Sequence, residues 1–338
     1  MIARRRRIGG RCNWTQFAGG GPPPLVSLFV SVALSVTANG AQTSPDGLVW
    51  TAQTTADSAS WVSVAYAPAL GLWCAVAVAP GGGGFVIMTS PDGSTWTTRA
   101  APAGNTDGWR KVVWSPDLDL FCAVASQGAG GRVMTSPDGI TWTERTAAAA
   151  NVWNGVAWSP SLGLFAAVAG SGSGNRVMTS PDGINWAIRS SAADFSWTDV
   201  EWSEDIGLFA AISLNGSTQH VMTSPDGINW TLRTTPDRSY SSITYSPTLG
   251  LFCAVATTAG GTGTLVMTSP DGVTWTARTT PQDSSWRKVC WSEGIALLCA
   301  VSSDGTRRVM TSPDGITWTL RTEAATVSYF CIGANDPL

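Results

Sequence analysis

The sequence of 338 residues has little charge: 13% of its residues are charged, and it contains two lysines and one histidine. The single histidine, His220, cannot form a histidine metal site, and no two of the seven cysteines have the spacing of zinc ligands. The formal net charge of −3 argues against the basic surface that nucleic-acid binding requires. We therefore expect no metal, no cofactor and no nucleic-acid partner, and we attribute the scarcity of lysine to coding bias.

An internal repeat organises most of the chain. The string Thr-Ser-Pro-Asp-Gly occurs seven times at intervals of 43 to 46 residues, and a tryptophan follows each glycine by three positions. Each interval contains four short segments rich in β-branched and aromatic residues, which predicts four strands separated by turns. One such unit cannot bury both of its faces, but units arranged radially pack on two neighbours. The sequence therefore predicts an all-β fold, a seven-bladed β-propeller with four-stranded antiparallel blades.

The two ends of the chain are expected to share one composite blade. Leu28 to Ala33 stands at the repeat position of a second strand, and Tyr329 to Ile332 stands where a first strand would lie. Joining them closes the ring and leaves no open edge. An alternative interpretation takes the apolar run from Leu25 to Val36, after a basic start, as a cleaved signal peptide. We place one propeller domain over residues 25–338 and a divergent or disordered segment over residues 1–24.

The repeated Ser-Pro-Asp-Gly string is a turn sequence. Proline presets φ at the first corner, aspartate can bond to nearby backbone, and glycine tolerates a positive φ. The string resembles the Asp box of the bacterial neuraminidase repeat (BNR) family, Ser-x-Asp-x-Gly-x-x-Trp, with one residue fewer between Asp and Gly. The resemblance implies a propeller in which the motif is a structural hairpin away from the active face. It assigns structural roles to Asp46, Asp92, Asp138, Asp182, Asp226, Asp271 and Asp314.

That family includes sialidases and other glycosidases, so a sialidase-type enzyme is one hypothesis. Sialidase chemistry needs three arginines on one carboxylate, a tyrosine nucleophile with a glutamate partner, and an aspartate acid/base. The four tyrosines stand at aromatic positions of the repeat, and six arginines recur on the outermost strand, where they cannot converge. We therefore expect no catalytic residues, although one-off acidic or arginine residues at the channel mouth would favour an enzyme. The residues concerned are Tyr66, Tyr240, Tyr245 and Tyr329, with Arg99, Arg145, Arg189, Arg233, Arg278 and Arg321.

Comparison of the repeats with one another separates a uniform face from a variable face. The turns between strands 1 and 2 and between strands 3 and 4 are nearly identical in every copy, and both lie on one face of an up-and-down blade. The loops between strands 2 and 3 and the links between blades differ in every copy, either for binding or through drift. The first-strand aromatics beside this variable-loop face are candidate ligand-binding residues, with interblade core as the alternative. They are Trp61, Trp109, Trp153, Trp197, Tyr240 and Trp286.

These observations favour a non-catalytic binding or display propeller that takes a glycan or protein ligand on its variable-loop face. The alternatives are a glycosidase-like enzyme and a structural component of a surface or virion appendage. Identical aromatic and polar pockets between blades would favour a lectin-like protein, and a large apolar patch would favour assembly. We expect no stable membrane span. The apolar N-terminal stretch, the few lysines and the sequons at Asn13, Asn215 and Asn229 suggest an extracellular or surface location.

Overall fold

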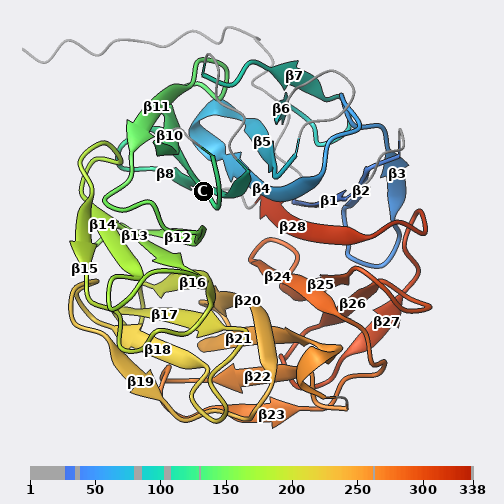
Figure 1. Ribbon diagram of the computed structural model, residues 1–338. Coiled ribbons are helices and arrows are strands. Elements are labelled where there is room, and N and C mark those ends of the chain that lie inside the picture. The colour runs from blue at the N-terminus through green and yellow to red at the C-terminus, as the bar shows by residue number, and fades with distance from the viewer. Residues whose placement is uncertain are drawn as a thin grey trace, which may run out of the picture.

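The computed structural model describes residues 27–34, 39–79, 86–102, 108–128, 131–261 and 263–335. These residues form seven antiparallel four-stranded sheets arranged as blades around a central axis (Figure 1). The fold is a seven-bladed β-propeller, so the predicted fold class is confirmed. The segment expected to be divergent or disordered over residues 1–24, with the sequon at Asn13, lies outside the described residues.

Each blade runs from an innermost strand at the axis to an outermost strand at the rim. Two short 3₁₀ helices, η1 (Pro68–Leu70) and η2 (Thr258–Gly260), occur in loops. Blade 1 contains β4 (Trp61–Ala67), β5 (Leu72–Ala77), β6 (Ile87–Ser90) and β7 (Thr97–Arg99); blade 2 contains β8 (Trp109–Ser115), β9 (Leu120–Ala125), β10 (Arg132–Ser136) and β11 (Thr143–Thr146); blade 3 contains β12 (Trp153–Ser159), β13 (Leu164–Ala169), β14 (Val177–Ser180) and β15 (Ala187–Arg189). Blade 4 contains β16 (Trp197–Ser203), β17 (Leu208–Ser213), β18 (Val221–Ser224) and β19 (Thr231–Arg233); blade 5 contains β20 (Ser239–Ser246), β21 (Leu251–Thr257), β22 (Val266–Ser269) and β23 (Thr276–Arg278); blade 6 contains β24 (Trp286–Ser292), β25 (Leu297–Ser302), β26 (Val309–Ser312) and β27 (Thr319–Arg321).

Blade 7 is the composite blade. Its strand order is β28 (Tyr329–Asn335), β1 (Leu28–Ala33), β2 (Ala41–Ser44) and β3 (Thr51–Gln53), so the innermost strand comes from the other end of the chain. Figure 1 shows the red β28 beside the blue β1, and the two strands pair from Leu28 opposite Asn335 to Ala33 opposite Tyr329. The prediction of a shared blade is therefore confirmed, and residues 28–33 of the apolar N-terminal run form a strand.

Every Ser-Pro-Asp-Gly turn is held by bonds inside the turn, as Asp182 illustrates. Its Oδ1 atom accepts hydrogen bonds from Ser180 Oγ at 3.0 Å and from the backbone N–H groups of Ile184 and Asn185 at 2.8 Å. Burial acts to raise the pKa of Asp182, but these bonds outweigh it and lower the pKa to about 2. Gly183 adopts a left-handed φ of 70°, which a side chain would disfavour.

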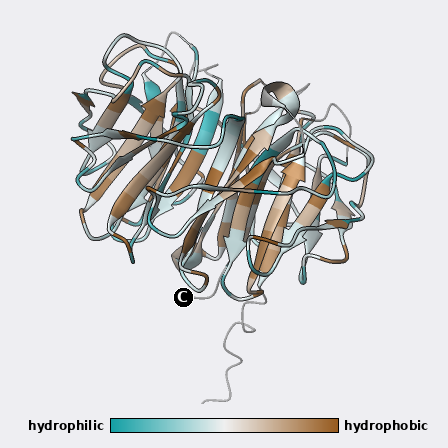
Figure 2. Ribbon diagram, turned by 90° about the horizontal axis from the view of Figure 1, so that it is seen from below, coloured by the Kyte–Doolittle hydropathy of each residue, from teal (hydrophilic) through white to brown (hydrophobic). Residues whose placement is uncertain are grey.

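The space between blades is filled by the aromatic and aliphatic residues that the repeat conserves. Figure 2 shows hydrophobic residues concentrated on the strands and hydrophilic residues in the connecting loops. On the rim, Arg189 Nε donates to Thr179 Oγ1 at 2.9 Å, and the other outer-strand arginines bond to the same threonine of their own blades. The expected ring of arginines on the outermost strands is confirmed. No helix in the described part of the chain is long and apolar enough to cross a membrane.

Candidate functional site

The innermost strands line the central channel, and their variable positions form rings around it. In each blade the first-strand aromatic is buried, as is the aliphatic residue three positions later. The residues between and after them differ from blade to blade. We define the mouth ring as the residues that directly follow the aromatic: Val62, Arg110, Asn154, Thr198, Ser241, Arg287 and Phe330. We define the middle ring as the next residues: Ser63, Lys111, Gly155, Asp199, Ser242, Lys288 and Cys331.

A pocket opens at each end of the channel. The loop-face pocket has a volume of about 290 Å³ and is lined by all seven residues of the mouth ring, together with Leu214 from the loop between β17 and β18. The turn-face pocket has a volume of about 370 Å³, and its wall includes Pro68 and Pro116 from the turns between strands 1 and 2. Both pockets are lined by Lys111 and Lys288, which therefore lie between them.

The two lysines of the chain converge on one carboxylate. Lys111 Nζ bonds to Asp199 Oδ1, and Lys288 Nζ lies 2.6 Å from Asp199 Oδ2. Asp199 Oδ2 also accepts a hydrogen bond from Ser242 Oγ at 3.1 Å. The Asp199 side chain is 3% exposed, and a buried carboxylate is stable only with such partners. We call Lys111, Asp199 and Lys288 the charged plug.

The electrostatics of the plug keep Asp199 ionised. Burial acts to raise the pKa of Asp199, but the two neighbouring ammonium groups outweigh it and lower the pKa to about 2. The sequence analysis attributed the scarcity of lysine to coding bias and gave neither lysine a role. The structure corrects this interpretation, because both lysines and Asp199 belong to one cluster in the channel.

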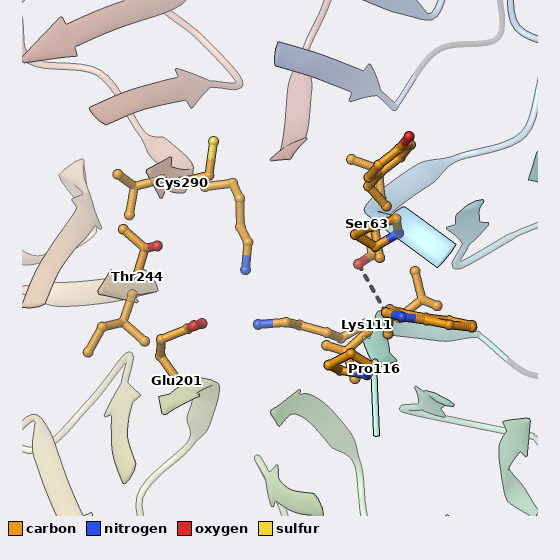
Figure 3. Close-up of a pocket in the computed structure, with 16 residues that line it drawn as sticks. Ser63, Lys111, Pro116, Glu201, Thr244 and Cys290 are labelled. Carbon is orange, nitrogen blue, oxygen red and sulfur yellow. Dashed lines mark hydrogen bonds between the residues drawn. The ribbon is translucent and has the colours of Figure 1, made fainter. Parts of the chain in front are cut away.

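Glu201 lies two residues beyond Asp199 on β16 and lines the turn-face pocket. Figure 3 shows its carboxylate and the Lys111 ammonium pointing toward one another across this pocket. Burial raises the pKa of Glu201 to about 7, with a further upward contribution from Asp199 and downward contributions from the two lysines. Glu201 therefore changes its charge near neutral pH.

Two arginines occupy equivalent places in the mouth ring. β8 and β24 both begin with Trp-Arg-Lys, so Arg110 and Arg287 each lie one position before a plug lysine in the same strand. Arg110 Nε donates to Ser126 Oγ at 2.9 Å, and Arg287 Nε donates to Ser303 Oγ at 2.9 Å. The mouth and middle rings therefore hold four cationic side chains against one carboxylate, although the whole chain carries a net charge of −3.

The uncharged polar residues of the mouth ring bond to the blades themselves. Thr198 Oγ1 lies 3.1 Å from the Tyr240 carbonyl, and Ser241 Oγ lies 2.6 Å from the Trp286 carbonyl. Asn154 Nδ2 donates to the Trp197 carbonyl at 2.9 Å. These contacts connect neighbouring blades and occupy hydrogen-bonding groups that a ligand would otherwise use.

The structure places the six first-strand aromatics in the interblade core, where none has exposed surface. Several bond to the link that precedes them: Trp61 Nε1 donates to the Asp57 carbonyl at 3.1 Å, and Tyr240 Oη donates to the Pro236 carbonyl at 3.2 Å. Their use in ligand binding stays a prediction, and it would require the blades to separate. The aromatics are Trp61, Trp109, Trp153, Trp197, Tyr240 and Trp286.

The residues that sequence reasoning missed lie one and two positions after these aromatics. They differ from the repeat background, and Trp-Arg-Lys-Val occurs in blades 2 and 6 only. These one-off charges are the feature that the sequence analysis associated with an enzyme. However, the groups that sialidase chemistry needs do not share a pocket. Tyr66 and Glu201 line the turn-face pocket, while two arginines line the loop-face pocket. The described residues contain no cluster of three or more His, Cys, Asp or Glu side chains suited to a metal ion.

No family model matches the sequence, and no curated protein matches it. Solved structures share its fold at low identity. A GH74 enzyme from Niastella koreensis matches with a TM-score of 0.69 and 15% identity over 89% of this chain and 53% of its own, so this chain spans about half its length. Virginiamycin B lyase from Staphylococcus aureus matches with a TM-score of 0.63 and 11% identity over 78% of this chain and 84% of its own.

A third match, YCF48 bound to D1 peptide, has a TM-score of 0.60 and 15% identity over 88% of this chain and 96% of its own. The three proteins include two enzymes and one protein in complex with a peptide. At these identities the similarity shows the β-propeller fold, which supports both enzymes and binding proteins.

Proposed function

We propose that this propeller is a non-catalytic binding module whose ligand occupies the loop-face pocket. The observation that carries the proposal is the mouth ring: one residue from every blade, at the same repeat position, lines a single pocket. The positions that build the interblade core stay nearly constant, while this ring varies from Phe330 to Arg287 to Asn154. Variable side chains on a rigid repeated scaffold are typical of a binding site.

The charge of the pocket indicates the chemistry of the ligand. Arg110 and Arg287 stand at the entrance, and two lysines share one carboxylate at the floor. This excess of cationic groups favours a protein or glycan ligand that presents an acidic group. The complex of YCF48 with a peptide shows that a related fold can bind a protein segment, which supports a protein ligand here.

A catalytic role has less support from the geometry. The plug lysines are held by Asp199, so neither ammonium is positioned as a free nucleophile. Glu201 titrates in a range suited to acid/base catalysis, but it lies in the turn-face pocket, away from the arginines. We therefore favour binding over a sialidase-type reaction.

The proposal is tested with glycan and peptide arrays probed by three proteins. The first is the wild type. The second is Val62→Trp, which fills the loop-face pocket from the mouth ring. The third is Leu162→Trp, a matched control on the exposed turn between β12 and β13. We expect selective binding by the wild type and the control and its loss in Val62→Trp, with all three folded by circular dichroism. Equal binding by both variants, or no selective binding by a folded wild type, would contradict the proposal.

A further inference from the structure

The loop-face pocket has two cationic groups separated by an apolar arc. Reading the mouth ring through consecutive blades 6, 7, 1 and 2 gives Arg287, Phe330, Val62 and Arg110. The Arg287 guanidinium lies 4.9 Å from the centroid of the Phe330 ring, a cation–π contact that also orients the arginine. Leu214 adds a third apolar side chain from the loop of blade 4. The pocket therefore offers positive charge and apolar surface side by side.

The two arginines are oriented alike by serines of their own blades. Each uses Nε to bond a serine that follows the second strand of its own blade, Ser126 for Arg110 and Ser303 for Arg287. Within the described residues neither guanidinium forms an ion pair. Their terminal Nη groups are thus the charged donors that the pocket can offer, in the planar arrangement that suits a carboxylate.

The floor and the opposite side of the pocket narrow the choice of ligand. The charged plug lies beneath the pocket, so a ligand enters end-on and stops there. The hydroxyl groups of Thr198 and Ser241 already bond to backbone carbonyls. A polyhydroxylated sugar would find few free partners for its hydroxyl groups, whereas a chain end with one acidic group and one apolar side chain would match the pocket.

We propose that the loop-face pocket binds the C-terminal end of a peptide, with its free carboxylate between Arg110 and Arg287 and its last side chain, an apolar one, against Phe330 and Val62. The inference rests on the proposed function, because it assigns a ligand class to the same pocket. It goes further by requiring an unblocked chain end, so an internal acidic segment of a protein would not satisfy it.

The test measures binding of short fluorescent peptides by polarisation. A set with random internal residues ends in leucine, valine, phenylalanine or aspartate, and each peptide is made with a free and with an amidated C-terminus. We expect the free peptides with apolar ends to bind best. Amidation should weaken their binding roughly tenfold or more, because it removes the charge that the bidentate arginine contacts recognise.

Two variants and two matched controls locate the contact. Arg110→Gln and Arg287→Gln should each weaken binding of the free peptides roughly tenfold or more. The amidated peptides should bind to these two variants as well as they bind to the wild type. Arg145→Gln and Arg321→Gln, on the outermost strands of the same two blades, should leave binding unchanged, because these arginines bond Thr135 and Thr311 at the rim.

The outcomes separate this proposal from the proposed function. Binding that Val62→Trp abolishes but amidation does not alter would place the ligand in the pocket and overturn the carboxylate assignment. Peptide binding that survives Val62→Trp would overturn both. Displacement of the peptides by N-acetylneuraminate or inorganic phosphate, without any preference for an apolar chain end, would show a general anion site and overturn the peptide assignment. Failure of every free peptide to bind would overturn it as well.

Discussion

Lys288 Nζ lies 2.6 Å from Asp199 Oδ2, although the two residues are 89 positions apart in the sequence. Lys111, which precedes Asp199 by 88 positions in the sequence, bonds the other carboxylate oxygen. These separations correspond to two repeats, so the three residues occupy equivalent places in blades 2, 4 and 6. The symmetry of the ring therefore brings together charges that are distant in sequence, and the cluster separates two pockets of different character.

Loss of the plug carboxylate should destabilise the protein strongly. Asp199→Asn leaves two ammonium groups in the channel without their counter-charge, and breaking a buried ion pair in this way costs about 3–5 kcal/mol of unfolding free energy. Urea denaturation followed by tryptophan fluorescence measures the change. The control is Asp194→Asn, which removes a 44% exposed carboxylate from its contact with Arg176. Equal losses in the two variants would show that the plug contributes no more than a surface pair.

Glu201 should make stability fall as pH rises through neutrality. Its pKa in the folded protein, about 7, is above the ordinary value of 4.5, so its favourable contribution is fully present below pH 4.5 and is lost as pH rises through 7. Glu201→Gln removes this dependence. The unfolding free energy of the wild type should fall by roughly 2–3 kcal/mol more than that of the variant when the pH is raised from 5 to 8. Denaturation curves at both pH values provide the measurement. Parallel pH profiles for wild type and variant would refute the assignment, and Glu144→Gln on β11 is the control.

The composite blade should depend on the apolar face of β28. Ile332 is 1% exposed and pairs with Ser31 across the junction of the two chain ends. Ile332→Ala should lower the unfolding free energy by about 2–4 kcal/mol, because it leaves a cavity in the blade. Ile188→Ala, on the outermost strand of blade 3 with 41% exposure, should have little effect. Thermal unfolding of both variants checks this, and similar small effects would mean that β28 does not complete the blade.

The aspartates of the Ser-Pro-Asp-Gly turns should act on stability and leave ligand binding unchanged. Asp182→Ala removes the acceptor for Ser180 and for two backbone N–H groups, and it should cost about 1–2 kcal/mol. Asp182→Asn retains an acceptor oxygen and should cost less. Chemical denaturation and peptide binding are measured on the same samples. A loss of binding at full stability would assign the motif to the ligand site instead.

Most of the fold could be predicted because each repeat encodes its own local structure. The turn sequence around Asp182 and the aromatic position of Trp153 predict the same turn and the same buried side chain in each repeat. Counting repeat positions was enough to pair the strand of Tyr329 with the N-terminal strands. Binding of the candidate aromatics to a ligand was inferred from their nearness to the variable face. The structure shows that the side chains one position further along, such as Arg110, line the channel.

The charged cluster escaped prediction because Lys111 and Lys288 lie 88 and 89 positions from Asp199 in the sequence. In a closed ring, the relevant comparison is between equivalent positions of different blades. Aligned in that way, Lys111, Asp199 and Lys288 fall in one register, and so do Arg110 and Arg287. Register alone does not give the partners or the burial of each group, because equivalent positions carry different residues. In blade 3, for example, the equivalent residue is Gly155, which contributes no side chain. The partners therefore required three-dimensional geometry.

The most direct test of the central claim, that the loop-face pocket is the ligand site, is a crystal structure of the protein with the peptide that binds most tightly. The account predicts electron density for the peptide over the channel axis, with its terminal carboxylate at Arg110 and Arg287 and its last side chain beside Phe330. A peptide bound in the turn-face pocket or along the outermost strands, with the loop-face pocket unchanged, would contradict it.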